Sequence, residues 1–245
     1  MRTRILIAAM SAAMLLPAAL PACKQGDSSK TKPLSPEQAH QREMLDKSFT
    51  ESKKVTALKV NGVAITEYYV LREMNAAAPR YLTARQQKTP DLDARIRRDA
   101  INILITQELA VQEARKRGIQ IQPAVIEDAL QTIRAQQGSE RAFHDYLGST
   151  GLTGEELKRV IENELLFERI ASLEIDKKID LSDPVLKERY NREKAGMTDA
   201  AHRQMTFEEA KGMLEQQLRA EATEKRVKAW EKELRKNAMV EIIRP

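Results

Sequence analysis

The chain has 245 residues with a formal net charge of +5 at pH 7, and 31% of its residues are charged whereas only 4% are aromatic. Basic and acidic residues are interspersed, which is typical of solvated helix faces, and so few aromatic rings disfavour stacking platforms for bases. Composition and charge therefore argue against nucleic acid as a partner.

Residues 1–22 have the pattern of a secretory signal peptide. Arg2 and Arg4 precede an apolar run over 5–20, which is shorter than the roughly 20 apolar residues of a transmembrane helix. Cys23, the only cysteine, follows directly. This placement predicts a bacterial lipobox in which Cys23 is lipidated and becomes the N-terminus, although Pro21 departs from the small residue usual there. The alternative is a free thiol beside a cleavage site.

Export and lipidation have consequences for charge and location. Removal of residues 1–22 takes away two arginines and lowers the net charge to about +3. A lipid anchor with more than one acyl chain binds a membrane stably. Lys24 favours anchoring to the outer membrane, with the inner membrane as the alternative. We therefore expect a periplasmic protein without internal disulfides.

Residues 23–54 are polar and predict a flexible tether, and residues 55–245 predict one folded domain. At the start of this domain, residues 55–60 read as a strand that ends at an Asn61-Gly62 turn, and Thr66 reads as a helix N-cap. Residues 239–243 are the other strand-like run. Because a lone strand cannot satisfy its own backbone groups, we expect the two ends of the domain to pair in a small two-stranded sheet.

Helical patterns fill the region between these strands, so the predicted fold class is mainly α. Apolar spacing, capping residues, prolines and glycines place helices at 66–78, 91–117, 123–138, 141–147, 153–179, from Pro184 onward, and from Thr206 to about Leu234. Pro79 and Pro90 are expected to bracket a loop.

The order of these segments resembles the N-terminal chaperone module of the SurA family, which PrsA-like foldases share. The resemblance covers about residues 55–245 and rests on four motifs: VNGVAIT at 60–66, LITQELAVQEARKRGI at 104–119, DPVLKERY at 183–190, and TFEEAK at 206–211. It implies a multi-helix SurA-type chaperone module that holds unfolded polypeptide against an apolar cradle between helices.

One part of the family pattern is missing. Most members carry a parvulin prolyl-isomerase domain between the last two motifs, and this domain needs roughly a hundred residues. Only residues 195–204, AGMTDAAHRQ, fill the gap here. The isomerase activity of the family is therefore not expected to carry over.

We find no pattern that predicts catalysis. His40, His144 and His202 lack metal-ligand spacing, and no nucleophile, zinc-protease or phosphate-loop motif is present. We expect no enzyme activity, no metal and no cofactor.

Candidate peptide-binding residues are soft or amphipathic side chains. Tyr68 and Tyr69 are adjacent in a predicted helix, so one should face the core and the other a groove. Methionines suit an adaptable lining, although any single methionine more often fills a gap in the core. The methionine candidates are Met74, Met197, Met205, Met213 and Met239.

These observations lead to one main hypothesis and two rivals. The main hypothesis is a lipid-anchored chaperone that holds unfolded exported polypeptides, including outer-membrane proteins. The alternative is a non-catalytic assembly subunit of a secretion or polysaccharide-export complex. An isomerase is the weaker rival. A homodimer formed by swapping an end strand or the last helix is compatible with the sequence.

Overall fold

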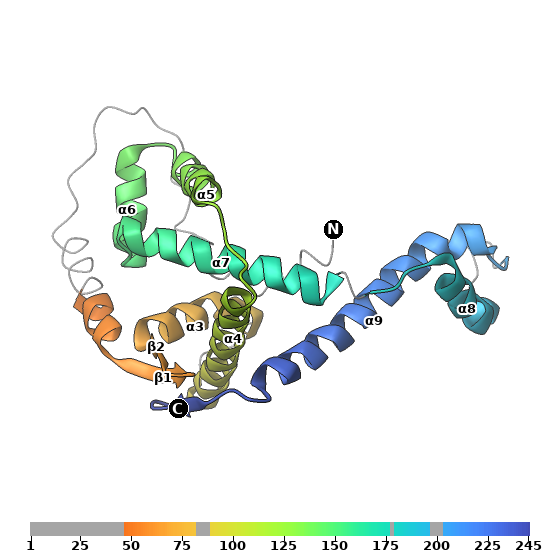
Figure 1. Ribbon diagram of the computed structural model, residues 1–245, viewed down its shortest axis with the longest axis horizontal. Coiled ribbons are helices and arrows are strands. Elements are labelled where there is room, and N and C mark those ends of the chain that lie inside the picture. Colours follow the sequence, from red (N-terminus) through yellow and green to blue (C-terminus); the bar gives the residue numbers. More distant parts are fainter. Residues whose placement is uncertain (1–46, 82–88, 177–178, 197–202) are drawn as a thin grey trace.

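The computed structural model describes residues 47–81, 89–176, 179–196 and 203–245, and these residues are mainly helical (Figure 1). The labelled helices are α3 (Glu67–Tyr81), α4 (Pro90–Lys116), α5 (Pro123–Gln136), α6 (Glu140–Thr150), α7 (Gly154–Glu174), α8 (Asp183–Glu193) and α9 (Phe207–Arg235). A 3₁₀ turn, η2 (Lys194–Gly196), follows α8. No helix in these ranges is long and apolar enough to cross a membrane.

A small antiparallel sheet joins the two ends of the domain. Its strands are β1 (Thr56–Val60), β2 (Val63–Thr66) and β3 (Val240–Ile242), in the order β2-β1-β3. The predicted pairing of the end strands is confirmed, because Lys59 of β1 faces Glu241 of β3.

The sheet has three strands instead of the two that we expected. Residues 63–66 fold back on β1 as a hairpin before α3 begins. Asn61 and Gly62 both have positive φ, at 50° and 85°. This conformation matches the right-handed twist of the flanking strands, so the predicted turn also creates a strand that we did not predict.

Two other boundaries differ from the sequence prediction. The helix α3 continues through Pro79 to Tyr81, whose hydroxyl group donates a hydrogen bond of 2.6 Å to Asp99 on α4. Pro79 lies in the last turn, where its missing N–H removes only one helical hydrogen bond. The helix α7 ends at Glu174, five residues before the predicted end.

Residues 47–54 are helical, although we expected them to belong to the tether. Phe49 packs against the cluster of buried side chains formed by α5, α6 and α7. Its ring lies so close to Gly151 that a Cβ atom at that position would be 2.8 Å from Phe49 Cγ. This packing, which sequence periodicity does not reveal, fixes the segment to the body.

The body of the molecule is built around α4. One side of α4 packs with α3 and the sheet in a cluster that includes Leu58, Val70 and Ile105. The other side packs with α7 and the C-terminal half of α9 around Phe167 and Trp230. The wide apolar stripe of α4 thus covers two neighbouring clusters, as its sequence predicts.

The helix α9 extends away from this body, and α8 lies beside its far end (Figure 1). We call α8 and the N-terminal half of α9 the arm. Leu186, Ala210 and Leu214 are fully buried there in a separate small cluster. The arm therefore has its own core.

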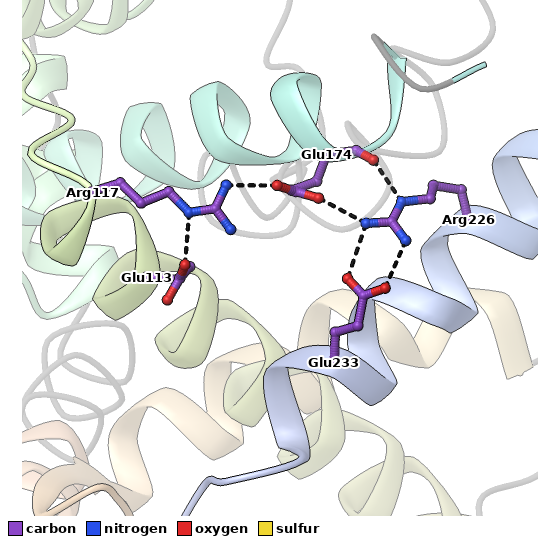
Figure 2. A network of polar contacts seen from close by, with 5 residues as sticks. All are labelled: Glu113, Arg117, Glu174, Arg226 and Glu233. Carbon is purple, nitrogen blue, oxygen red and sulfur yellow. Dashed lines mark hydrogen bonds and ion pairs between the residues drawn. The ribbon is translucent and has the colours of Figure 1, made fainter. Parts of the chain in front are cut away.

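A network of charged side chains holds the C-terminal half of α9 against α4 and α7 (Figure 2). Glu174 of α7 lies between two guanidinium groups, at 2.6 Å from Arg117 Nη1 and 2.7 Å from Arg226 Nη2. Arg226 also pairs with Glu233 at 2.9 Å. The network joins α4, α7 and α9.

Candidate functional site

A pocket opens between β2 and α7, and we call it the β2–α7 pocket. Its volume is about 240 Å³. Its lining comes from β2 (Val63, Ala64, Ile65), α3 (Tyr69), α4 (Leu104, Gln107, Glu108, Val111) and α7 (Arg159, Val160, Asn163, Glu164, Phe167). A space of this size fits a few side chains of a partner.

Helical spacing explains how α4 and α7 build the two helical walls. Lining residues recur at intervals of three or four along each helix, so they share one face. On each wall, apolar side chains enclose polar ones. On α7, for example, Val160 and Phe167 lie on either side of Glu164. The pocket is therefore apolar around a polar centre.

Glu164 is the most unusual group in this pocket. Only 8% of the residue is exposed, and its Oε2 atom has no hydrogen-bond partner within the described ranges. Burial raises the pKa of Glu164 to about 8, and the carboxylates of Glu168 and Glu73 act in the same direction. A carboxyl group that holds its proton near pH 7 can donate a hydrogen bond as well as accept one.

Glu73 of α3 is a second buried carboxyl group near this site. It is 3% exposed, and burial raises its pKa to about 7. Arg72 opposes the pKa rise at both Glu73 and Glu164 through its positive charge. The interior between α3 and α7 therefore contains two carboxyl groups whose pKa values are both raised by burial.

The two adjacent tyrosines have different environments, as expected. Tyr68 is 2% exposed, donates a hydrogen bond to the carbonyl oxygen of Thr150, and contacts the ring of Phe49 edge-on. Burial raises the pKa of Tyr68 to about 12. Tyr69 is half-buried and lines the β2–α7 pocket. Tyr68 therefore lies in the core, and Tyr69 reaches the pocket.

The methionine candidates do not gather at this pocket. Met74 packs beside the cluster formed by α4 and the sheet, and Met205 packs in the arm. Met213 is 39% exposed on α9, and Met239 is 76% exposed before β3. Met197 and Cys23 lie outside the described residues. A role of these methionines in peptide binding stays a prediction.

Sequence reasoning missed the polar centre of the pocket. Glu164 and Gln107 interrupt apolar helical stripes, and this interruption is the signal that could have identified them. We read the stripes only as core. The β2 lining was missed because residues 63–66 were not recognised as a strand.

Within the described ranges, no group of three His, Cys, Asp or Glu side chains could hold a metal ion. His144 is exposed on α6. His40 and His202 lie outside the described residues.

Comparisons with known proteins place this geometry in context. Residues 45–171, more than half of the chain, match the family model of the SurA-like N-terminal domain. One similar solved structure comes from work that describes PEB4 and Cj1289 as two structurally related SurA-like chaperones of Campylobacter jejuni. It has a TM-score of 0.48 and 14% identity, and the match covers 78% of this chain and 100% of that one. No curated protein matches the chain.

The spacing of α8 and α9 excludes a parvulin domain between them. The helix α8 ends at Glu193 and α9 begins at Phe207. A domain of roughly a hundred residues does not fit in this interval.

Proposed function

Because the chain belongs to the family of SurA-like N-terminal domains, we propose that it is a periplasmic chaperone of the holdase type, which binds unfolded exported polypeptides without catalysing a reaction. Its clients would include outer-membrane proteins in transit. Release would follow from folding of the client.

The observation that carries the proposal is the β2–α7 pocket. Apolar walls favour the side chains of unfolded polypeptide, because these side chains leave water when they bind. Polar groups in the pocket can satisfy the backbone of a bound segment, which every sequence possesses. A site of this kind tolerates many sequences, as a holdase requires.

The test is suppression of aggregation. A denatured outer-membrane protein is diluted into buffer with and without the chain from Lys24 onward, and light scattering is followed. We expect scattering to fall at near-stoichiometric amounts of chaperone. Unchanged scattering with a folded, helical protein would contradict the holdase function and favour an assembly subunit with one fixed partner.

A pair of variants connects this activity to the pocket. Val63 on β2 is 45% exposed and lines the pocket, whereas Val125 on α5 is 46% exposed and does not. We expect Val63→Lys to weaken suppression of aggregation several-fold, because the charge enters an apolar wall, and Val125→Lys to leave it unchanged. Equal effects of the two substitutions would place client binding elsewhere.

We include the lipid anchor at Cys23 in the proposal, with the outer membrane as the expected location. Its support is the position of this single cysteine directly after an apolar segment. Mass spectrometry of the N-terminal peptide from membranes should show a diacylated cysteine, and Cys23→Ser should release the protein into the soluble periplasmic fraction. An unmodified thiol on the mature protein would refute the anchor.

The absence of catalysis and a dimeric state have separate tests. A proline-peptide isomerisation assay should give the background rate. In the structure β1 and β3 belong to one chain. Sedimentation of the purified chain would detect a swapped dimer.

A further inference from the structure

The strand β2 is an outer strand of the sheet, and one of its residues faces away from β1. Val63 and Ile65 pair with Val60 and Leu58 across the hairpin. In an antiparallel pair, the backbone groups of successive residues point alternately toward and away from the partner strand. The N–H and C=O groups of Ala64 therefore point outward, on the side that borders the β2–α7 pocket.

This edge carries no charged residue and no proline that would block further strand pairing. Natural edge strands are commonly guarded by charges, prolines or a covering element. The sequence of β2 is Val-Ala-Ile-Thr, with no charge and no proline. The opposite edge strand, β3, carries Glu241 and spans only three residues. An uncharged edge beside a pocket is suited to receive an extended peptide.

The charges in the lining favour a ligand with a positive charge. Two carboxyl groups, Glu108 and Glu164, line it, and Glu164 Oε2 is buried without a hydrogen-bond partner in the described ranges. Glu108 accepts a hydrogen bond of 2.7 Å from Gln112. Arg159 is the one basic residue among the described lining residues, and it is exposed, whereas Arg72 of α3 contributes a second positive charge near Glu164. A cationic group that enters the pocket would therefore meet the carboxyl groups of Glu108 and Glu164, and its positive charge would favour the ionised form of Glu164 over the protonated form that burial favours.

We propose that the β2–α7 pocket binds a short extended segment of unfolded polypeptide as an added strand on β2, and that it prefers a segment whose apolar residues flank one Lys or Arg. This inference rests on the proposed chaperone function and names the class of client segment. The backbone of the segment pairs with Ala64, and its basic side chain reaches Glu164.

The two contacts have different roles. Pairing with Ala64 supplies one backbone donor and one backbone acceptor, and it does not depend on client sequence. The basic side chain favours loss of the Glu164 proton to solvent and donates a charge-assisted hydrogen bond to the resulting carboxylate, and this contact does depend on sequence. Together the two contacts allow many extended segments to bind, with a moderate preference for segments that contain a Lys or Arg.

The first experiment measures this preference. The probes are a fluorescent seven-residue peptide of alternating valine and threonine around a central lysine, and the same peptide with norleucine in place of lysine. Anisotropy titrations should show roughly tenfold tighter binding of the lysine peptide. Glu164→Gln should abolish the difference. The matched control is Glu162→Gln on the same helix, because Glu162 lines a different depression, between α5 and α7, and the preference should persist.

The second experiment tests strand addition without altering the protein. The lysine peptide is N-methylated at one residue at a time. Methylation should abolish binding only at the position that pairs with Ala64, because the N–H groups of its two neighbours point the other way. Ala64→Pro removes the outward N–H from the protein side and should weaken binding of every peptide to a similar degree.

The outcomes separate this inference from the proposed function. If the chain suppresses aggregation but prefers neither peptide, or keeps its preference in Glu164→Gln, the inference is wrong and the chaperone function stands. Uniform tolerance of N-methylation would overturn strand addition. A dimer that Ala64→Pro dissociates would also overturn it, because a second copy would then occupy the edge. If aggregation is not suppressed at all, the chaperone function itself fails.

Discussion

Glu164 and Glu73 are carboxyl groups in positions where ionisation is costly. Burial is the largest cause of the rise in both pKa values, to about 8 and about 7. In the unfolded chain each would ionise near 4.5. The folded state therefore binds protons that the unfolded state has already lost.

This difference predicts how stability depends on pH. Because the folded state holds the extra protons, the free energy of unfolding is highest below about pH 4.5 as far as these groups are concerned, and it falls as pH rises toward 8. We expect Glu164→Gln to reduce the loss of stability between pH 5 and pH 9 by on the order of 3 kcal/mol. Urea unfolding at pH 5 and at pH 9 measures this difference in the free energy of unfolding.

The matched control at this scale is again Glu162→Gln. Glu162 is half-buried on the same helix. Its replacement should leave the pH dependence close to that of the original chain. If Glu164→Gln lost as much stability between pH 5 and pH 9 as the original chain does, Glu164 would ionise normally in the folded protein.

At the scale of elements, Glu174 connects three helices through its carboxylate. It is 4% exposed, and its two oxygens accept hydrogen bonds from Arg117, the C-cap residue of α4, and from Arg226 of α9 (Figure 2). Arg226 Nε also donates to the backbone oxygen of Glu174 at the end of α7. Arg226 therefore both neutralises a buried charge and caps a helix terminus.

We expect Arg226→Ala to destabilise the protein by about 2 kcal/mol, because it removes one of the guanidinium groups that neutralise the buried Glu174. Lys228→Ala is the control two residues away: Lys228 and Glu224 form an exposed pair, which contributes well under 1 kcal/mol. Urea unfolding at fixed pH compares the two. Equal losses would show that the network contributes little beyond a surface ion pair.

Local signals predicted most of the helices and the pairing of the end strands. The capping boxes at Thr153–Glu156 and Thr206–Glu209 both form and begin α7 and α9, because side-chain capping needs only neighbouring residues. The continuation of α3 past Pro79 was not predictable, because contacts of Tyr81 with α4 stabilise it. The pocket could not be placed either, since it depends on how α4 and α7 approach β2.

At the scale of the whole molecule, the body and the arm have separate cores. The arm cluster around Leu186 and Leu214 contains no residue of α3 to α7. The helix α9 belongs to both parts, because Trp230 in its C-terminal half packs in the body. Stability should therefore differ between the two parts.

This division predicts that the arm can be loosened on its own. Leu214 is fully buried in the arm, and Leu214→Ala should cost about 2–3 kcal/mol of local stability. Amide hydrogen exchange should then speed up in α8 and the first half of α9, with α4 and α7 unchanged. Ile170→Ala, a fully buried residue of the body, should instead speed exchange in both parts. Faster exchange throughout in Leu214→Ala would indicate one cooperative unit.

The closure of the sheet by β3 has a consequence for the order in which the chain can fold. Asn61 and Met239 exchange hydrogen bonds across 178 residues of sequence, so β1 leaves the ribosome long before its second neighbour, β3. Until then, the β2–β1 hairpin is an incomplete sheet with an additional open edge. Contacts so distant in sequence form slowly, since a long loop must close first. The protein that we propose as a chaperone would thus itself expose an unpaired strand until β3 has been synthesised.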